Sequence, residues 1–216
     1  MSLFKYLPKK YLDAFMEKGS LRIGTLHEYR QQEKYGPAVG DPREGFQFTA
    51  MDLPGGGEID FSQRSKETDF FRSIFRIPES PGRHLTVRME SGATFRARSE
   101  SVEMYIYCVS SEYSELVMRE FDCDSCLEIV APDNFFVAIS ERVREHATFN
   151  SLGSVRYVDR KTRYTTPHTV HPAIMKDPEY SYQKEWRAMW TPVAPPKGPL
   201  YVDVPPAIAF ARVRSC

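Results

Sequence analysis

Polar and apolar side chains alternate along residues 182–190, with the sequence YQKEWRAMW. Because a β-strand points successive side chains to opposite faces, this alternation predicts a strand. One face would carry Tyr182, Lys184, Trp186, Ala188 and Trp190, and the other Gln183, Glu185, Arg187 and Met189. The first face, apart from its lysine, predicts contact with a hydrophobic core. The Gln-x-Glu-x-Arg pattern of the second face is compatible with a solvated sheet surface and with the wall of a site.

Around this strand, the chain predicts an α+β fold of many short, mostly antiparallel strands with three or four helices. A length of 216 residues suits one domain, so we expect residues 1–216 to form a single unit. A hydrophobic content of 41% indicates a folded chain rather than a disordered one. Helical spacing predicts helices over 8–19, 66–75, 113–121 and 132–146, with a short turn over 25–31. Strands are predicted over 3–7, 20–24, 45–51, 84–89, 93–98, 102–109, 126–130, 155–158, 200–204 and 208–213.

Residues 31–45 are polar and rich in glycine and proline, which predicts a mobile loop. Loops of this length in a compact domain are often functional. Residues 53–57, LPGGG, predict a turn without a phosphate role, because the lysine and hydroxyl residue of a phosphate-binding loop are missing.

Basic residues gather near a predicted hairpin in which a Ser91-Gly92 turn joins the strands over 84–89 and 93–98. They are Arg83, Arg88, Arg96 and Arg98. The last two would share one face of their strand and could contact a phosphate backbone. A solvated hairpin face, balanced by nearby glutamates, explains the same pattern.

Charge and composition limit the classes of partner and compartment. Lys+Arg and Asp+Glu both number 29, so no net field draws the whole chain to nucleic acid. No apolar run approaches the roughly 20 residues of a membrane-spanning helix, and the first residues lack the apolar segment of a signal peptide. Four cysteines in this length do not make a disulfide framework. We therefore expect a cytoplasmic protein that makes no membrane contact.

Two metal hypotheses can be formed from the residues. Cys123 and Cys126 form a CxxC pair, and His168 and His171 form an HxxH pair about 40 residues later. Together these four residues could bind zinc, although their spacing is unlike the common zinc-finger patterns.

A second hypothesis places Asp41, Glu44 and Glu185 around a hard metal ion in a nuclease. The dense acidic pattern of such a site is missing from the strands, so we assign no metal ligand.

Several segments together resemble AbiGi-like bacterial proteins, which are linked to abortive phage infection, and a related uncharacterised family. The opening of that family has a KY…G.L…T/S run before an NDP.EG-like loop. Here the corresponding segments are FKYL at 4–7, LRIGT at 21–25 and GDPREG at 40–45, in which Gly40 replaces the usual asparagine. YCVS at 107–110 and the segment at 180–187 also resemble the family.

A more distant similarity is to ADP-ribosyltransferases, which also begin strand–helix–strand and use a glutamate on a late strand. Gln183 and Glu185 match the Gln-x-Glu spacing of one subgroup. The chain departs from that family in two places. Lys5 and Tyr6 stand where an arginine or histidine is usual, and only Gly24-Thr25 is available for the Ser-Thr-Ser strand.

The similarity to ADP-ribosyltransferases implies an NAD-consuming enzyme whose acceptor, protein or nucleic acid, is unknown. Glu185 would stabilise the oxocarbenium-like state of the ribose, and Gln183 would position the acceptor. The implied NAD-binding residues are Lys5, Tyr6, Arg22, Thr25 and Tyr29. Two other interpretations stay open: a non-enzymatic binding module that captures a partner through residues 31–45, and the metal-dependent nuclease.

Overall fold

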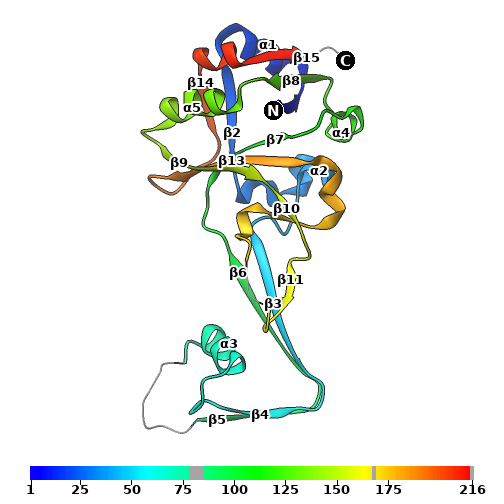
Figure 1. The fold of residues 1–216 in the computed structure, drawn as a ribbon, viewed down its shortest axis with the longest axis vertical. Helices are drawn as coiled ribbons and strands as arrows, with labels where there is room; N and C mark the ends of the chain where they lie inside the picture. The colour runs from blue at the N-terminus through cyan, green and yellow to red at the C-terminus, as the bar shows by residue number, and fades with distance from the viewer. Residues whose placement is uncertain (78–84, 167–168, 215–216) are drawn as a thin grey trace.

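A large antiparallel sheet and a narrow arm make up the molecule, which we describe from a computed structural model covering residues 1–77, 85–166 and 169–214 (Figure 1). The strand order of the large sheet is β14-β2-β7-β1-β8-β15, and β13 pairs with β7 and β9. The strands are β1 (Leu3–Leu7), β2 (Ser20–Thr25), β7 (Tyr105–Ser110), β8 (Ser125–Ile129), β9 (Ala147–Ser154), β13 (Glu185–Pro192), β14 (Leu200–Asp203) and β15 (Ala211–Arg214). The predicted α+β architecture with mostly antiparallel strands is confirmed.

The sheet splits along one edge of β7. The other edge of β7 pairs with β13 throughout, from Ser110 opposite Glu185 to Tyr105 opposite Trp190. On the split edge, β1 pairs with β7 only at Ser110. β2 pairs with its opposite end, at Tyr105 and Ile106. Within the described residues, positions 107–109 therefore have no strand partner on that edge.

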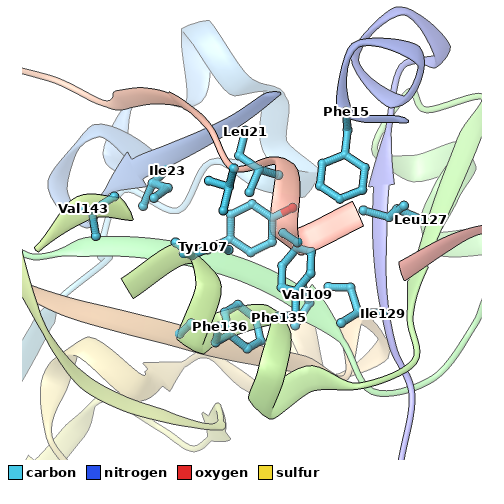
Figure 2. Close-up of a cluster of buried hydrophobic side chains, with 14 of the residues drawn as sticks. Phe15, Leu21, Ile23, Tyr107, Val109, Leu127, Ile129, Phe135, Phe136 and Val143 are labelled. Carbon is cyan, nitrogen blue, oxygen red and sulfur yellow. The ribbon is translucent and has the colours of Figure 1, made fainter. Parts of the chain in front are cut away.

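The main core fills the space between this sheet and two helices, α1 (Lys9–Lys18) and α5 (Pro132–Val143). Figure 2 shows Phe15 of α1 and Phe135 of α5 pointing toward Tyr107 of β7. Proline at the first position fixes the start of α5, since its fixed φ suits a first helical turn. Gly19 ends α1 with a φ of +74°. A Cβ at Gly19 would lie 2.3 Å from the Val204 carbonyl oxygen, so only glycine fits.

The arm is a long ribbon built from β3 (Phe46–Leu53) and β6 (Ala93–Glu100), with β11 (Lys161–Arg163) beside β3. It continues as β4 (Gly57–Asp60) paired with β5 (Thr86–Met89), and α3 (Lys66–Phe75) packs at its end (Figure 1). A second apolar cluster holds this end together: Met51, Ile59, Phe61, Phe70, Phe71 and Met89.

The predicted hairpin of β5 with β6 is wrong, because β5 pairs with β4 and β6 pairs with β3. The turn at Ser91-Gly92 bends the ribbon and does not reverse it. Both Gly56 and Gly92, which have positive φ, donate backbone hydrogen bonds to the Leu53 carbonyl at this bend. Arg83 and His84, which we assigned to this hairpin, lie outside the described residues.

Short elements between the sheet and the arm are η1 (His27–Arg30), α2 (Gln32–Val39), β10 (Arg156–Tyr157), η2 (Pro172–Ile174), β12 (Met175–Lys176) and η3 (Pro178–Gln183). Two others, α4 (Glu115–Glu120) and η4 (Pro205–Phe210), connect strands of the large sheet. The predicted loop over 31–45 is wrong in its first half, where α2 forms with a kink at Gly36. The strand predicted over 182–190 begins only at Glu185, because the preceding residues form η3, which has proline in its first turn. In the described ranges, no helix combines the length and apolarity needed to cross a bilayer.

Candidate functional site

A cavity of about 150 Å³ lies where the large sheet splits. Its lining comes from both ends of the chain: residues 4–6 of β1 face residues 183–187 of η3 and β13. The other lining residues are Tyr29, Val39, Glu44, Ile106, Cys108, Val109, Ser110, Phe121, Cys123 and Lys176. The late carboxylate predicted from the sequence therefore shares a recess with the first strand.

Lys5 occupies the gap in the sheet. Its ammonium donates a hydrogen bond of 2.8 Å to the Cys108 carbonyl, on the stretch of β7 that has no strand partner. The ammonium also lies 4.8 Å from the centroid of the Tyr107 ring. Among the described residues, no carboxylate is within ion-pair distance of this group. Burial lowers the pKa of Lys5 below its usual value, because a buried ammonium loses its hydration.

The polar wall of the cavity is a charge network centred on Arg187. Its Nε donates to Glu185 Oε1 at 2.6 Å, and its two terminal nitrogens contact the two oxygens of Glu44 at 2.8 and 2.9 Å. Lys176 completes the network with a bond of 2.7 Å to Glu185 Oε2. All four side chains are buried. Two cations therefore balance two carboxylates, which is the condition for stable burial of charge.

Glu185 is ionised in this setting. Burial opposes ionisation, but the charges of Arg187 and Lys176 outweigh it and hold the pKa of the carboxyl well below its usual range. The backbone N–H of Glu185 donates to the Tyr157 hydroxyl at 2.7 Å, which fixes the start of β13. A carboxylate has about four lone-pair sites, so Glu185 keeps acceptor capacity toward the cavity.

Gln183 connects the charge network to α2. Its amide oxygen accepts from Lys176 Nζ at 2.6 Å, and its amide nitrogen donates to the Ala38 carbonyl at 2.7 Å. Both ends of the side chain are thus engaged inside the protein. Gln183 orients Lys176 and the end of α2, so it is a positioning residue and is not free to bind an acceptor.

The segment after α2, residues 40–45, is bound to the same charge network. Glu44 binds Arg187 as described, and Asp41 forms a buried ion pair with Arg160. Arg160 also donates to the Met175 carbonyl at 2.9 Å, just before Lys176. The GDPREG segment singled out in the sequence therefore packs over the charge network through Asp41 and Glu44, while Pro42 is exposed at the surface.

Aromatic rings and thiols form the remaining walls. The Tyr6 hydroxyl accepts from Ser114 N–H at 2.7 Å, and its ring lies 6.2 Å from that of Phe121. Burial raises the pKa of Tyr6 to about 12 and the pKa of Cys123 to about 11. Burial, aided by the negative charge of Glu185, raises the pKa of Cys108 to about 12. These groups stay neutral at pH 7. One wall of the cavity, the charge network, is therefore ionic, and the walls formed by the aromatic rings and thiols are uncharged.

Five of the seven residues predicted for the site line the cavity: Lys5, Tyr6, Tyr29, Gln183 and Glu185. Arg22 does not, because Glu28 and Tyr35 hold its guanidinium at 2.7 and 2.8 Å, away from the cavity. Thr25 is buried in the pairing of β2 with β7, and its N–H donates to Glu28. These two residues therefore lie outside the cavity wall, and their role in binding NAD stays a prediction.

Sequence reasoning missed three important lining residues. Lys176 sits on a two-residue strand that carries no periodic signal. Glu44 stood in a recognised motif, but nothing in the sequence showed that it would pair with Arg187, 143 positions away. Phe121 ends α4 and showed only the pattern of a core residue.

The geometry disfavours both metal hypotheses. Cys126 is fully buried in an apolar cluster with Tyr6, and His168 lies outside the described residues. Asp41, Glu44 and Glu185 each bind an arginine or lysine instead of gathering around open space. In the described part of the chain, no three His, Cys, Asp or Glu side chains form a group that could hold a metal ion.

The cavity has the size of a single ring. Ligand pockets usually measure about 300–1,000 Å³, whereas a cavity of about 150 Å³ takes a benzene-sized group. A shallower groove of about 490 Å³ lies next to it, and Phe121 lines both. Residues 35–38 of α2, Tyr182 and two acidic residues, Glu120 and Asp122, form the other walls of this groove. A ligand with one ring inside the cavity would extend over α2.

Comparisons of the chain with protein-family models, with curated proteins and with solved structures find no match.

Proposed function

We propose that the protein is an NAD-dependent ADP-ribosyltransferase-like enzyme that acts in the cytoplasm, in bacterial phage defence. The observation that carries the chemical part of the proposal is the ring-sized cavity with an ionised glutamate, Glu185, in its wall. The phage-defence setting rests on the sequence resemblance to AbiGi-like proteins.

In the proposed reaction, the bond between the ribose C1′ and the nicotinamide nitrogen breaks, and its electron pair leaves with nicotinamide. An acceptor nucleophile forms the new bond to C1′ and gives up its proton. Positive charge develops on the ribose during this step. Glu185 stabilises that charge and accepts a hydrogen bond from a ribose hydroxyl, because a fixed carboxylate in a dry site is most effective where charge develops.

The other residues position the dinucleotide. The nicotinamide ring enters the cavity against Tyr6, Tyr29 and Phe121, which offer flat aromatic surfaces. The remainder of NAD lies in the groove over α2. Lys34 and Arg22 both lie over the Tyr35 ring at one wall of that groove, with Lys34 Nζ 4.8 Å and Arg22 Cζ 5.7 Å from the ring centroid. Arg22 is already paired with Glu28, so Lys34 supplies the positive charge for a pyrophosphate there, against the carboxylates of Glu120 and Asp122 in the same groove.

The test compares the wild type with Glu185→Gln in two assays: binding of NAD by calorimetry and release of nicotinamide by chromatography. We expect the variant to bind NAD within a few-fold of the wild type and to lose about 10²–10³-fold in nicotinamide release, the usual effect of removing one transition-state contact. Circular dichroism establishes that the variant is folded.

Two results would reject the enzyme. One is a wild-type protein that neither binds NAD nor transfers label from NAD to any component of a bacterial lysate. The other is a folded Glu185→Gln variant with undiminished nicotinamide release. Either result would favour the non-enzymatic binding module.

A further inference from the structure

One face of the arm combines aromatic and basic side chains on three adjacent strands. In β3, residues 47, 49 and 51 are buried, whereas 46, 48 and 50 point to the opposite, partly open side. Residues directly opposite each other on paired strands share a face. The register therefore places Arg98 and Lys161 on either side of Phe48, and Arg96 and Arg163 on either side of Ala50. We call these six residues and Phe46 the arm face.

The four cations of the arm face are exposed and largely unneutralised. No described carboxylate lies within ion-pair distance of Arg96, Arg98, Lys161 or Arg163. On the described parts of β3, β6 and β11, acidic groups stand at the two ends of the face. Glu100, opposite Phe46, is bound to Arg30 at 2.6 Å, and Asp52 accepts a hydrogen bond from Thr94. A chain without net charge thus carries a local basic surface.

The two phenylalanines of the face are arranged differently. Phe46 is covered by guanidinium groups, with Arg30 Cζ at 3.8 Å and Arg98 Cζ at 4.6 Å from its ring centroid. Phe48 is half-buried, and its ring centroid lies 6.3 Å from that of Phe46. Phe48 therefore lies at the centre of the face, between two cations, and no guanidinium of the described residues covers its ring.

The opposite side of the ribbon packs against the arm's own core. Met51 belongs to the apolar cluster with Phe70 and Phe71 of α3, and Gln47 and Thr49 are buried. The open face therefore does not contribute to this core, and its composition needs another explanation. Basic side chains flanking an aromatic ring on a sheet match the requirements of a single nucleic-acid strand, whose bases stack and whose phosphates need cations.

We propose that the arm face binds single-stranded nucleic acid, with one base stacked on Phe48 and phosphates alongside β6 and β11. Adjacent cations on one strand are two residues, or about 6.6 Å, apart, so they form a row on each side of the ring. A lipid surface or an acidic peptide would use the cations but not the flat ring. The proposal does not depend on the cavity or on NAD.

The experiment measures binding of fluorescent 12-nucleotide RNA and DNA oligonucleotides, and of the matching duplexes, by anisotropy from 50 to 300 mM salt. We expect single strands to bind more tightly than duplexes. Affinity should fall with salt with a logarithmic slope of about −0.7 per phosphate contacted. Comparison of the RNA and DNA arms identifies which sugar the face prefers.

Two sets of variants separate the contributions of charge and stacking. Arg96→Ala/Arg163→Ala should make the salt slope less steep by about 1.4, whereas Phe48→Ala should weaken binding about 5- to 100-fold at unchanged slope. The charge-matched control is Arg119→Ala/Arg144→Ala, one on α4 and one just after α5, which should leave both quantities unchanged. Melting curves check that each variant is folded.

Three results would overturn the proposal: no single-strand binding at 50 mM salt, equal loss in the control pair, or a Phe48→Ala variant that binds like the wild type. Tighter binding to anionic vesicles or to poly-glutamate than to either oligonucleotide would also reject it, in favour of a general anion surface.

Discussion

Replacing Glu44 with glutamine probes the charge network that forms the cavity wall. In the wild type, both oxygens of Glu44 accept from Arg187, whose side chain is 1% exposed. In Glu44→Gln, the amide nitrogen faces a guanidinium N–H, and two buried cations share one carboxylate. Breaking a buried ion pair from one side costs about 3–5 kcal/mol, because the remaining charge is left without compensation. For a domain of this size, that cost lowers the Tm by about 6–20 °C.

Differential scanning calorimetry of Glu44→Gln beside Glu58→Gln gives the direct comparison. Glu58 lies on the arm, 62% exposed, and pairs at 3.7 Å with an 87% exposed arginine, so its loss should stay within the roughly 0.5 kcal/mol usual for surface changes. In a double-mutant cycle, the Glu44→Gln/Arg187→Gln protein should lose less stability than the sum of the two single variants, by more than about 0.5 kcal/mol. Equal Tm values for Glu44→Gln and Glu58→Gln, or strictly additive losses, would refute the assignment of this network as a coupled unit.

Two further predictions concern backbone and protonation. The pKa of Lys5 in the folded protein lies below its unfolded value near 10.5, so between these two pKa values the unfolded chain binds more protons than the folded one. The free energy of unfolding of the wild type, relative to Lys5→Met, should therefore rise with pH across this range. Urea midpoints of the two proteins that run parallel from pH 7 to 10.5 would contradict this. Gly19→Ala should lower the free energy of unfolding by at least about 2 kcal/mol, because φ at position 19 is positive and a Cβ there would overlap the Val204 carbonyl. Gly55→Ala has open space around its Cβ and should unfold like the wild type. Equal denaturation midpoints for these two alanine variants would show that the backbone relaxes around position 19.

Local signals predicted the helices and the faces of the late strand well. α1, α3 and α5 begin and end within a few residues of their predicted bounds, because proline, glycine and helical periodicity are properties of neighbouring residues. On β13, Ala188 and Trp190 enter the main core, and Glu185 and Arg187 face the cavity network. The alternation therefore identified the two faces, although it could not show that both would be buried.

Pairings across long distances in sequence were not predictable. The turn at Ser91-Gly92 gave a hairpin signal, but β6 pairs with β3 and β5 with β4, both of which lie far earlier in the chain. Gly36 and Pro37 interrupt the helical pattern of α2, so the sequence predicted a loop where the structure has a kinked helix. Asp41 and Glu44 gave no indication of their arginine partners, because ion pairing depends on the folded chain and leaves no local pattern.

The split in the sheet also affects how the protein is made. Lys5 fills the gap beside β7, and Glu185, 180 positions later, closes the other side of the cavity. At a synthesis rate of about 5–20 residues per second, roughly 9–36 s pass between the appearance of these two residues on the ribosome. β7 ends at Ser110, so for the last 75 positions of that interval, about 4–15 s, the nascent chain carries β7 without its partner β13. The unpaired edge of β7 is then a place where chaperones or premature pairing would act.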